Sequence, residues 1–310
     1  MVKIISSHYE LGQKKESLED LCKINPHWDY ERLLLKTGIK NRYVLGANQS
    51  PETLSIEVGK TCINKISNKE VNGIIYVSQS PSKPLPTRAC LLQDKLGLGK
   101  NSLAFDINQG CSGFVYALSV ATSLIKNDCA SRIIILCADY YSKYIPVNDR
   151  TSRPIFSDAA AAVIIEKSKE NKIEPFIFKT AGDGGEFLTV KEKNGRNNLY
   201  MDGPAVLKFS LSLVPEATKE LLEKANYTME DIDKFIYHQA SAVVLNKLQK
   251  KLNIPDYKWF NKIENLGNTV SATIPIAINL LQSKKEFSYK HKYLMMGFGV
   301  GLSVAGCIIS

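Results

Sequence analysis

The chain has 310 residues, of which 44% are hydrophobic and 23% charged, and a formal net charge of +9. This balance is typical of a globular protein with a sizeable core, and the apolar runs are too short for a membrane-spanning helix or a secretory signal peptide, so we expect a cytoplasmic protein. The basic residues are spread over short segments without interleaved aromatics, which favours a solvated surface first, an acidic protein partner or phosphorylated cofactor second, and nucleic acid last.

Strands and helices alternate along the first half of the chain. The sequence predicts a strand over residues 2–7, a helix over residues 28–37, and a helix over residues 51–65 with Ser50 as its N-cap. Apolar runs predict buried strands at residues 73–77, 132–138 and 159–166. This alternation indicates an α/β fold with a largely parallel sheet.

Residues 104–125, AFDINQGCSGFVYALSVATSLI, predict a short strand, a tight turn and a helix without charged residues, with Cys111 at its start. Unpaired N–H groups and the positive end of the dipole gather at a helix N-terminus, so the pKa of this thiol can fall from about 8.5 into the range of roughly 3.5–7.5. The small residues around Cys111 let a substrate approach the sulfur. The alternative is that Cys111 is a small buried hydrophobic residue, as most cysteines are.

The second half of the chain repeats the plan of the first. Residues 73–76 (GIIY) correspond to residues 234–237 (KFIY), and each segment follows an amphipathic helix. Gly267-Asn268 opens a second charge-free helix, over residues 269–283, as Gly110-Cys111 opens the first. We therefore expect two halves of similar fold, residues 1–167 carrying the nucleophilic cysteine and residues 168–310 carrying the histidine and asparagine discussed below.

A helix without charge on any side has to be covered all round. Two such helices, one in each half, predict a central helical layer between two sheets with amphipathic helices outside. The expected fold class is therefore α/β, a duplicated five-layer α/β/α/β/α body. Pro275 should kink the second central helix, unless the regular part of that helix begins later than residue 269.

Three residues form the candidate catalytic group: Cys111, His238 in YHQAS and Asn268 in NLGNTVSA. A thiolate can take an acyl group from a thioester and hold it covalently. Loss of CO₂ from a second, malonyl-type thioester gives an enolate, which a histidine N–H and an asparagine amide would stabilise at roughly 3–4 kcal/mol for one such donor. The backbone N–H groups of Cys111 and of the turn around Val300 are the candidates for the first oxyanion hole.

The sequence gives little support for a disulfide framework, a metal site or a dinucleotide-binding site. The seven cysteines contain no CxxC pair and the four histidines no HExxH or HxxxH spacing, which argues against a disulfide framework and a metal site. Residues 297–301 (GFGVG) resemble a dinucleotide-binding glycine run, but no helix and no downstream acid follow them. A structural histidine and a helix-capping asparagine remain the ordinary alternatives for His238 and Asn268.

With these motifs in order, the sequence resembles the ketoacyl-acyl-carrier-protein synthase III enzymes of the thiolase superfamily over nearly its whole length. The shared segments are Thr37-Gly38-Ile39 with Arg42, Gly110-Cys111-Ser112-Gly113-Phe114, Asp149-Arg150, Phe156-Ser157-Asp158, His238-Gln239-Ala240 and Gly267-Asn268-Thr269. The resemblance implies the five-layer fold, Cys111 as the acylated nucleophile, and His238 and Asn268 as the residues that promote decarboxylation and condensation. It also implies a homodimer, acyl carrier protein as a partner, and coenzyme A or phosphopantetheine thioesters as substrates without a permanently bound cofactor.

The resemblance further implies binding roles for residues outside the catalytic group. Substrate-binding positions are Arg32, Leu85, Arg150, Lys208 and Phe298, and carrier-protein docking positions are Lys208, Lys250 and Lys251. Arg32 stands where the family often has an aromatic residue that stacks on adenine, and Val243 stands where it has an arginine. Val300 replaces a usual glycine and Val304 a usual tryptophan, which makes a specialised paralog using another acyl group plausible beside an enzyme of fatty-acid initiation.

Three other functions stay open at this point. An acyltransferase of the same fold could move the acyl group to an amine or hydroxyl, although the His238/Asn268 pair favours carbon–carbon bond formation. Chemistry like that of 3-hydroxy-3-methylglutaryl synthase ranks lower, because residues 77–80 (VSQS) hold no acid for a general base. A non-catalytic carrier-protein-binding subunit would be expected to lose part of the catalytic trio. Residues 182–200 are expected at the entrance of the site, without a predicted conformation.

Overall fold

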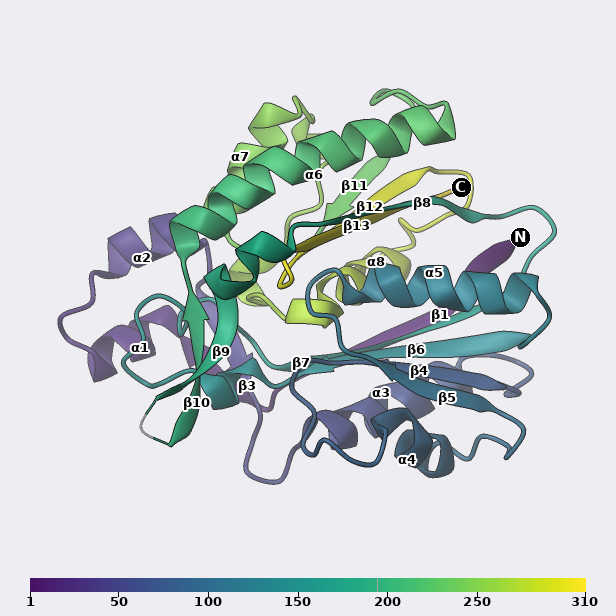
Figure 1. The fold of residues 1–310 in the computed structure, drawn as a ribbon, viewed down its shortest axis with the longest axis horizontal. Coiled ribbons are helices and arrows are strands. Elements are labelled where there is room, and N and C mark those ends of the chain that lie inside the picture. Colours follow the sequence, from purple (N-terminus) through teal and green to yellow (C-terminus); the bar gives the residue numbers. More distant parts are fainter. Residues whose placement is uncertain (194) are drawn as a thin grey trace.

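The computed structural model describes residues 1–193 and 195–310, and its body is built around two β-sheets (Figure 1). The first sheet has the strand order β1-β7-β6-β4-β5. Its members are β1 (Val2–Leu11), β4 (Gly73–Val77), β5 (Leu103–Ile107), β6 (Arg132–Asp139) and β7 (Ala159–Lys167). The second sheet has the order β11-β12-β13-β8, with β8 (Ile173–Thr180), β11 (Lys234–Tyr237), β12 (Tyr293–Gly299) and β13 (Ser303–Ile309).

Helices fill the space between the sheets and cover both outer faces. The central layer consists of α5 (Gly113–Lys126) and α8 (Thr273–Ser283), and both helices contact strands of both sheets. α3 (Pro51–Asn64) and α4 (Arg88–Lys95) cover the first sheet, while α6 (Gly203–Ala225) packs on the second sheet and α7 (Ala242–Lys251) packs on α6 (Figure 1). The predicted α/β/α/β/α layering is confirmed.

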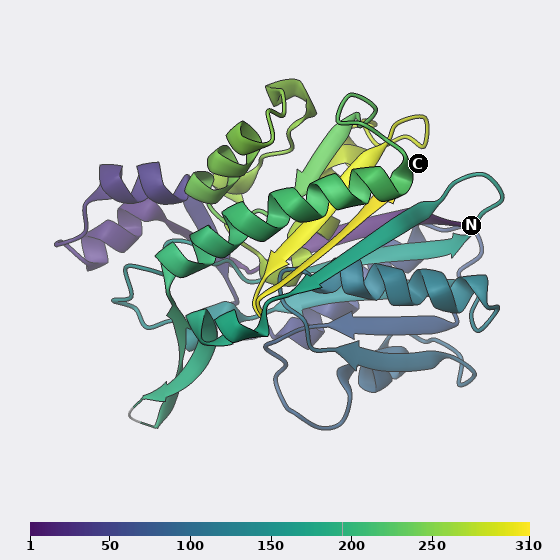
Figure 2. The same ribbon diagram turned by 45° about the horizontal axis from the view of Figure 1, so that its top comes forward.

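Most of the remaining elements lie at the end of the body where the site is found. β2 (Lys14–Ser17) pairs with β3 (Asn41–Val44) beside α1 (Leu18–Ile24) and α2 (Tyr30–Thr37). The segment after β8 forms a 3₁₀ turn, η2 (Gly182–Phe187), and a ribbon of β9 (Leu188–Lys193) and β10 (Arg196–Met201) that projects from the body (Figure 2). The other 3₁₀ turns are η1 (Tyr141–Tyr144), η3 (Asp256–Lys258), η4 (Ile263–Asn265) and η5 (Val270–Ala272).

Local sequence signals set several helix ends as expected. Ser50 caps α3 in a capping box with Thr53, so two N-terminal N–H groups are paired, and Pro51 occupies the first turn. Gly38 ends α2 in the left-handed conformation at φ 68°, and its N–H donates to the Leu34 carbonyl. None of the helices within the described residues is long and apolar enough to cross a bilayer.

The expectation of a largely parallel sheet is wrong, because both sheets are mixed. β4 runs parallel to β5 and β6, but β7 is antiparallel to both of its neighbours. A parallel neighbour needs a crossover, which is usually a helix, and the segment 140–158 between β6 and β7 contains no α-helix, with the short η1 turn as its one helical element. In the second sheet only β11 and β12 are parallel.

The second central helix begins later than residue 269. Residues 270–272 form η5, and α8 begins at Thr273. Pro275 therefore lies in the first turn of α8, where its missing N–H interrupts no helical hydrogen bond, so the expected kink is absent.

Candidate active site

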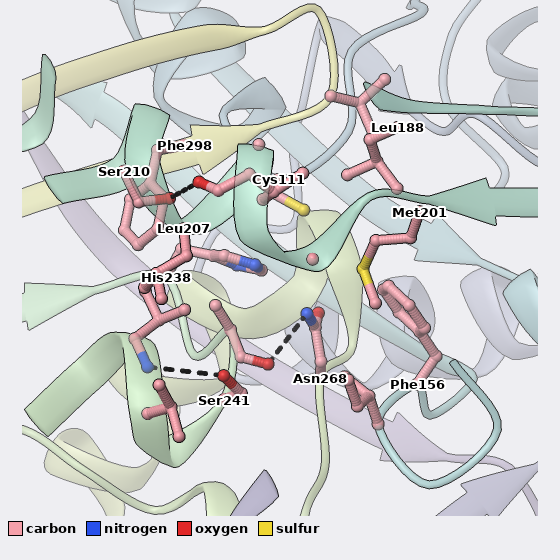
Figure 3. Close-up of a pocket in the computed structure, with 18 of the residues that line it drawn as sticks. Cys111, Phe156, Leu188, Met201, Leu207, Ser210, His238, Ser241, Asn268 and Phe298 are labelled. Atoms are coloured by element: carbon pink, nitrogen blue, oxygen red, sulfur yellow. Dashed lines mark hydrogen bonds between the residues drawn. The ribbon is translucent and has the colours of Figure 1, made fainter. Parts of the chain in front are cut away.

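The carboxyl ends of the parallel strands of both sheets meet around one cavity of about 290 Å³. This is the edge at which open α/β sheets place their ligands. Cys111, His238 and Asn268 all line this cavity, and their sulfur, imidazole and amide face the same space (Figure 3). The rest of the wall is mainly apolar, with Phe156, Leu188, Met201, Leu207, Val243, Val244 and Phe298 among its residues. The cavity opens where its lining residues Lys36, Thr151 and Pro204 are exposed.

Cys111 lies in the turn between β5 and α5 and is only 4% exposed. Gly299, at the end of β12, approaches it so closely that a Cβ there would lie 3.0 Å from the Cys111 sulfur. Gly299 also has φ +156°, a conformation that favours glycine. Glycine at 299 thus brings the end of the second sheet against the sulfur.

The prediction of a lowered pKa for the Cys111 thiol is wrong for this state. Burial raises the pKa above its ordinary value, and the negative charge of Asp139 adds to that effect. The backbone N–H groups of Cys111 and Val300 oppose it, because both donate toward the sulfur. Desolvation outweighs the helix N-terminus here because the surroundings of Cys111 are apolar.

His238 follows β11 directly and is 1% exposed. Its backbone N–H donates to the Met296 carbonyl at 2.9 Å, its Nδ1 lies 2.8 Å from the Thr273 hydroxyl, and its ring meets the Phe298 ring edge-on at 5.5 Å. Burial lowers the pKa of His238 to about 3, so the imidazole is neutral at any working pH. These contacts hold the ring in one orientation toward the cavity.

Asn268 is fixed by its backbone and by its side chain. Its N–H donates to the Ile155 carbonyl at 2.9 Å, and its carbonyl accepts from the Ser157 N–H at 2.8 Å. The side-chain Oδ1 accepts from the Val270 N–H at 2.9 Å, and Nδ2 donates to the Ala240 carbonyl at 3.3 Å. Because Oδ1 is occupied by a donor, the NH₂ group is the one that faces the cavity, with one N–H left for a ligand.

The structure separates the remaining predicted residues into two groups. Phe298 and Val300 line the cavity with the catalytic group. The others are exposed and outside the cavity wall: Arg32, Leu85, Arg150, Lys208, Lys250 and Lys251. Arg150 and Lys208 are sequence neighbours of the lining residues Thr151 and Leu207.

Several residues near the site were not found from the sequence. Thr273 binds His238, Tyr141 lines the cavity, and Asp139 accepts hydrogen bonds from Ser271 beside Asn268. Asp139 ends the strand RIIILCAD, which is apolar from Ile133 to Ala138, and an acid in that position is the one signal that could have drawn attention to it. Among the described residues, no group of three His, Cys, Asp or Glu side chains could hold a metal ion.

Comparisons with known proteins identify the relatives of this chain. A family model described as 3-oxoacyl-[acyl-carrier-protein (ACP)] synthase III matches residues 105–184, and the model of its C-terminal part matches residues 222–310. The β-ketoacyl-[acyl-carrier-protein] synthase III of Clostridium perfringens (strain ATCC 13124) is 34% identical over 312 residues, which cover 96% of this chain and 94% of the relative. The enzyme of the same name from Lactococcus lactis is 32% identical and covers 98% of this chain and 97% of its own.

Solved structures give the same result. The crystal structure of 3-oxoacyl-[acyl-carrier-protein] synthase III from Aquifex aeolicus VF5 is similar to this chain with a TM-score of 0.93 and 31% identity, over 100% of this chain and 99% of that one. OleA from Xanthomonas campestris shares the fold, with a TM-score of 0.87 at 16% identity. This chain belongs to the β-ketoacyl-ACP synthase III family of the thiolase superfamily, and it is a condensing enzyme of the acyltransferase class.

Proposed function

We propose that Cys111 carries the acyl group and that His238 and Asn268 act on the second substrate. In the first half-reaction the Cys111 sulfur attacks the carbonyl of an acyl thioester. A new bond forms between Sγ and the acyl carbon, and the bond between the acyl carbon and the donor sulfur breaks. The donor takes up the proton of Cys111 and leaves as a thiol. The placement of all three side chains on one cavity is the observation that supports this assignment.

The oxyanion of the first step forms on the acyl carbonyl oxygen, next to the reacting sulfur, and it needs two donors that can reach this oxygen. The N–H groups of Cys111 and Val300 are the candidates, because both lie beside Sγ and lower the pKa of the thiol. Valine at position 300 is compatible with this role, because Val300 is not among the residues with positive φ and it keeps its N–H. We therefore retain Cys111 and Val300 as the oxyanion hole.

In the second half-reaction a malonyl-type thioester loses CO₂ and leaves an enolate. The enolate carbon attacks the acyl-cysteine carbonyl, a C–C bond forms, the S–C bond to Cys111 breaks, and the Cys111 thiolate takes a proton from water. An N–H on Nε2 of His238 and the cavity-facing N–H of Asn268 would stabilise the enolate oxygen. A neutral His238 carries its proton on Nε2 when the Thr273 hydroxyl gives its one proton to Nδ1, at 2.8 Å, rather than to the Val270 carbonyl, at 3.2 Å.

The cavity suits a short acyl group. Tyr141, Leu188 and Val300 line the active-site cavity on one face and a second cavity of about 270 Å³ on the other. The Tyr141 hydroxyl donates to Gln79 Oε1 at 2.8 Å, and its ring packs on Phe156 at 5.3 Å. We propose that this wall ends the acyl-binding space, so that chains of a few carbons are accepted.

The substrates are proposed to be an acyl-coenzyme A and a malonyl-carrier protein, with no permanently bound cofactor. Exposed lysines on α6 and α7, the helices that carry the lining residues Leu207 and Val243, support docking of an acidic carrier protein; these are Lys208, Lys247, Lys250 and Lys251. The roles of Arg32 and Arg150 at a coenzyme A mouth remain predictions. The acyl group that the enzyme prefers is determined by assaying a series of acyl-coenzyme A donors.

A homodimer is proposed on the evidence of an unpaired sheet edge. β5 has a strand partner on one side alone within the described residues, and its side chains Leu103, Phe105 and Ile107 are half-buried. Leu85 is 78% exposed in this single chain and Leu91, on the adjoining α4, 43%. Apolar exposure of this kind is typical of an interface. A cytoplasmic location and the division into residues 1–167 and 168–310 remain predictions.

Mass spectrometry and CO₂ detection test the assignment. Incubation with acetyl-coenzyme A should add one acetyl group to the wild type and none to Cys111→Ser. Addition of malonyl-carrier protein should then release CO₂ and form a 3-oxoacyl product. An adduct with any short acyl donor but no CO₂ would indicate transfer to an amine or hydroxyl, and no adduct at all would overturn the role of Cys111.

A further inference from the structure

The turn between Asn268 and Thr273 contains a residue in an unfavourable backbone conformation. Val270 has φ +54°, in the left-handed region, and is fully buried. A β-branched residue is an outlier there, because its Cβ crowds the following carbonyl. Such a conformation persists only where the surroundings hold it, and it is often found at functional sites.

This turn touches both residues that are proposed to act on the malonyl substrate. The Val270 N–H donates to Oδ1 of Asn268 at 2.9 Å, which sets the direction of the amide. The Val270 carbonyl lies 3.2 Å from the Thr273 hydroxyl, which is 2.8 Å from Nδ1 of His238. A shift of the turn would therefore move the Asn268 amide and the partner of the His238 ring together.

Asp139 holds the turn from the other half of the chain. Its Oδ2 accepts from the Ser271 N–H at 3.2 Å and from the Ser271 hydroxyl at 2.5 Å. Its Oδ1 accepts from the Gln79 N–H and the Ser80 hydroxyl, each at 2.9 Å. Asp139 is 1% exposed and is not part of the cavity wall, so it cannot meet a substrate.

We propose that Asp139, acting through Ser271, is a positioning residue for decarboxylation that holds the strained 268–273 turn and with it His238 and Asn268. The inference rests on the proposed function. It gives Asp139 no contact with Cys111 or with the Val300 N–H, which are carried by the start of α5 and the end of β12, so its influence on acyl transfer is limited to the charge that raises the pKa of the thiol. The hydrogen bonds of Asp139 also rule it out as a general base, because Oδ1 accepts from Gln79 and Ser80 and Oδ2 accepts from Ser271.

The two half-reactions can be measured separately in variants of this contact. Acetyl transfer from acetyl-coenzyme A to Cys111 is followed by mass spectrometry in Ser271→Ala. CO₂ release from malonyl-carrier protein is followed in the same variant carrying Cys111→Ala, so that it does not depend on acylation. Loss of a hydrogen bond to a buried carboxylate should slow CO₂ release about 10-fold to 100-fold and change the acetylation rate less than about 3-fold.

Two matched variants separate positioning from general stability. Ser80→Ala removes a hydroxyl from the other oxygen of the same carboxylate and leaves the Ser271 contacts in place, so its CO₂ release should stay within about 3-fold of the parent. Asp139→Asn should slow CO₂ release as Ser271→Ala does, while acetylation is unchanged or faster, because the variant also removes the charge that raises the pKa of the Cys111 thiol. The double variant of these two should lose less than the product of the single effects, since both act on one contact.

Each outcome decides the inference. It is overturned if Ser271→Ala slows both half-reactions equally, if Ser80→Ala slows CO₂ release as much as Ser271→Ala does, or if CO₂ release is unchanged in Ser271→Ala. Thermal unfolding identifies a variant that has not folded. If Asp139→Asn does not fold, the two half-reactions are compared in Ser271→Ala alone. Failure of the wild type to acetylate Cys111 would instead contradict the proposed function, so the two failures are distinguishable.

Discussion

Lowering the pH should destabilise this protein through His238. The folded-state pKa of His238 is about 3 because the ring is buried, whereas an unfolded histidine titrates near 6.5. Between these values the unfolded chain binds a proton that the folded chain does not, so stability from this site is complete above pH 6.5 and is lost as the pH falls toward 3. Between pH 7.5 and 5.0 the loss is about 2 kcal/mol, at about 1.4 kcal/mol for each pH unit below 6.5.

Urea unfolding at pH 7.5 and 5.0 measures this contribution. The drop in the free energy of unfolding should be about 2 kcal/mol smaller in His238→Gln than in the wild type, because the variant has no group to protonate at this position. Asn268→Ala is the matched control, since it changes the same cavity without removing a titrating group, and its drop should equal that of the wild type. An identical drop in His238→Gln and the wild type would show that His238 is not buried and neutral as described here.

Three further variants test single parts of the site. Thr273→Val leaves Nδ1 of His238 without its partner, at a cost of about 1–3 kcal/mol, so CO₂ release should fall roughly 5-fold to 150-fold with acetylation of Cys111 preserved; equal loss of both would contradict the role of Thr273. Tyr141→Ala should join the two cavities and shift the preference among acyl-coenzyme A donors toward longer chains, whereas an unchanged preference would place the end of the acyl site elsewhere. Lys250→Glu with Lys251→Glu should raise the KM for malonyl-carrier protein and leave acetylation by acetyl-coenzyme A unchanged; a KM that does not move would refute docking on α7.

Much of the architecture could be predicted because the duplication is visible in the sequence. Two charge-free helices have to lie in a covered layer, and each follows a glycine and a candidate catalytic residue, Cys111 or Asn268. Equivalent positions in two similar halves meet at one edge, which is how these residues and His238 come to share a cavity. This prediction was possible because Cys111 and Asn268 each stand just before a buried helix, and the start of such a helix lies at the edge of the covered layer.

The features that were missed depend on contacts between distant segments. The direction of β7 follows from the absence of a crossover helix after β6, which residue patterns between 140 and 158 do not reveal. The raised pKa of the Cys111 thiol reflects apolar packing from the second half of the chain. The bond from Ser271 to Asp139 joins residues 132 positions apart, and neither residue has a local pattern that indicates its partner.

The central claim is that one cavity holds two separable half-reactions, with the nucleophile on Cys111 and the enolate donors on His238 and Asn268. It is tested most directly by measuring CO₂ release from malonyl-carrier protein and acetylation by acetyl-coenzyme A in Cys111→Ala, His238→Ala and Asn268→Ala. Cys111→Ala should release CO₂ but take no acetyl group, and the other two variants should become acetylated at Cys111 but release CO₂ at least about 100-fold more slowly. Normal CO₂ release by His238→Ala and Asn268→Ala would contradict the account.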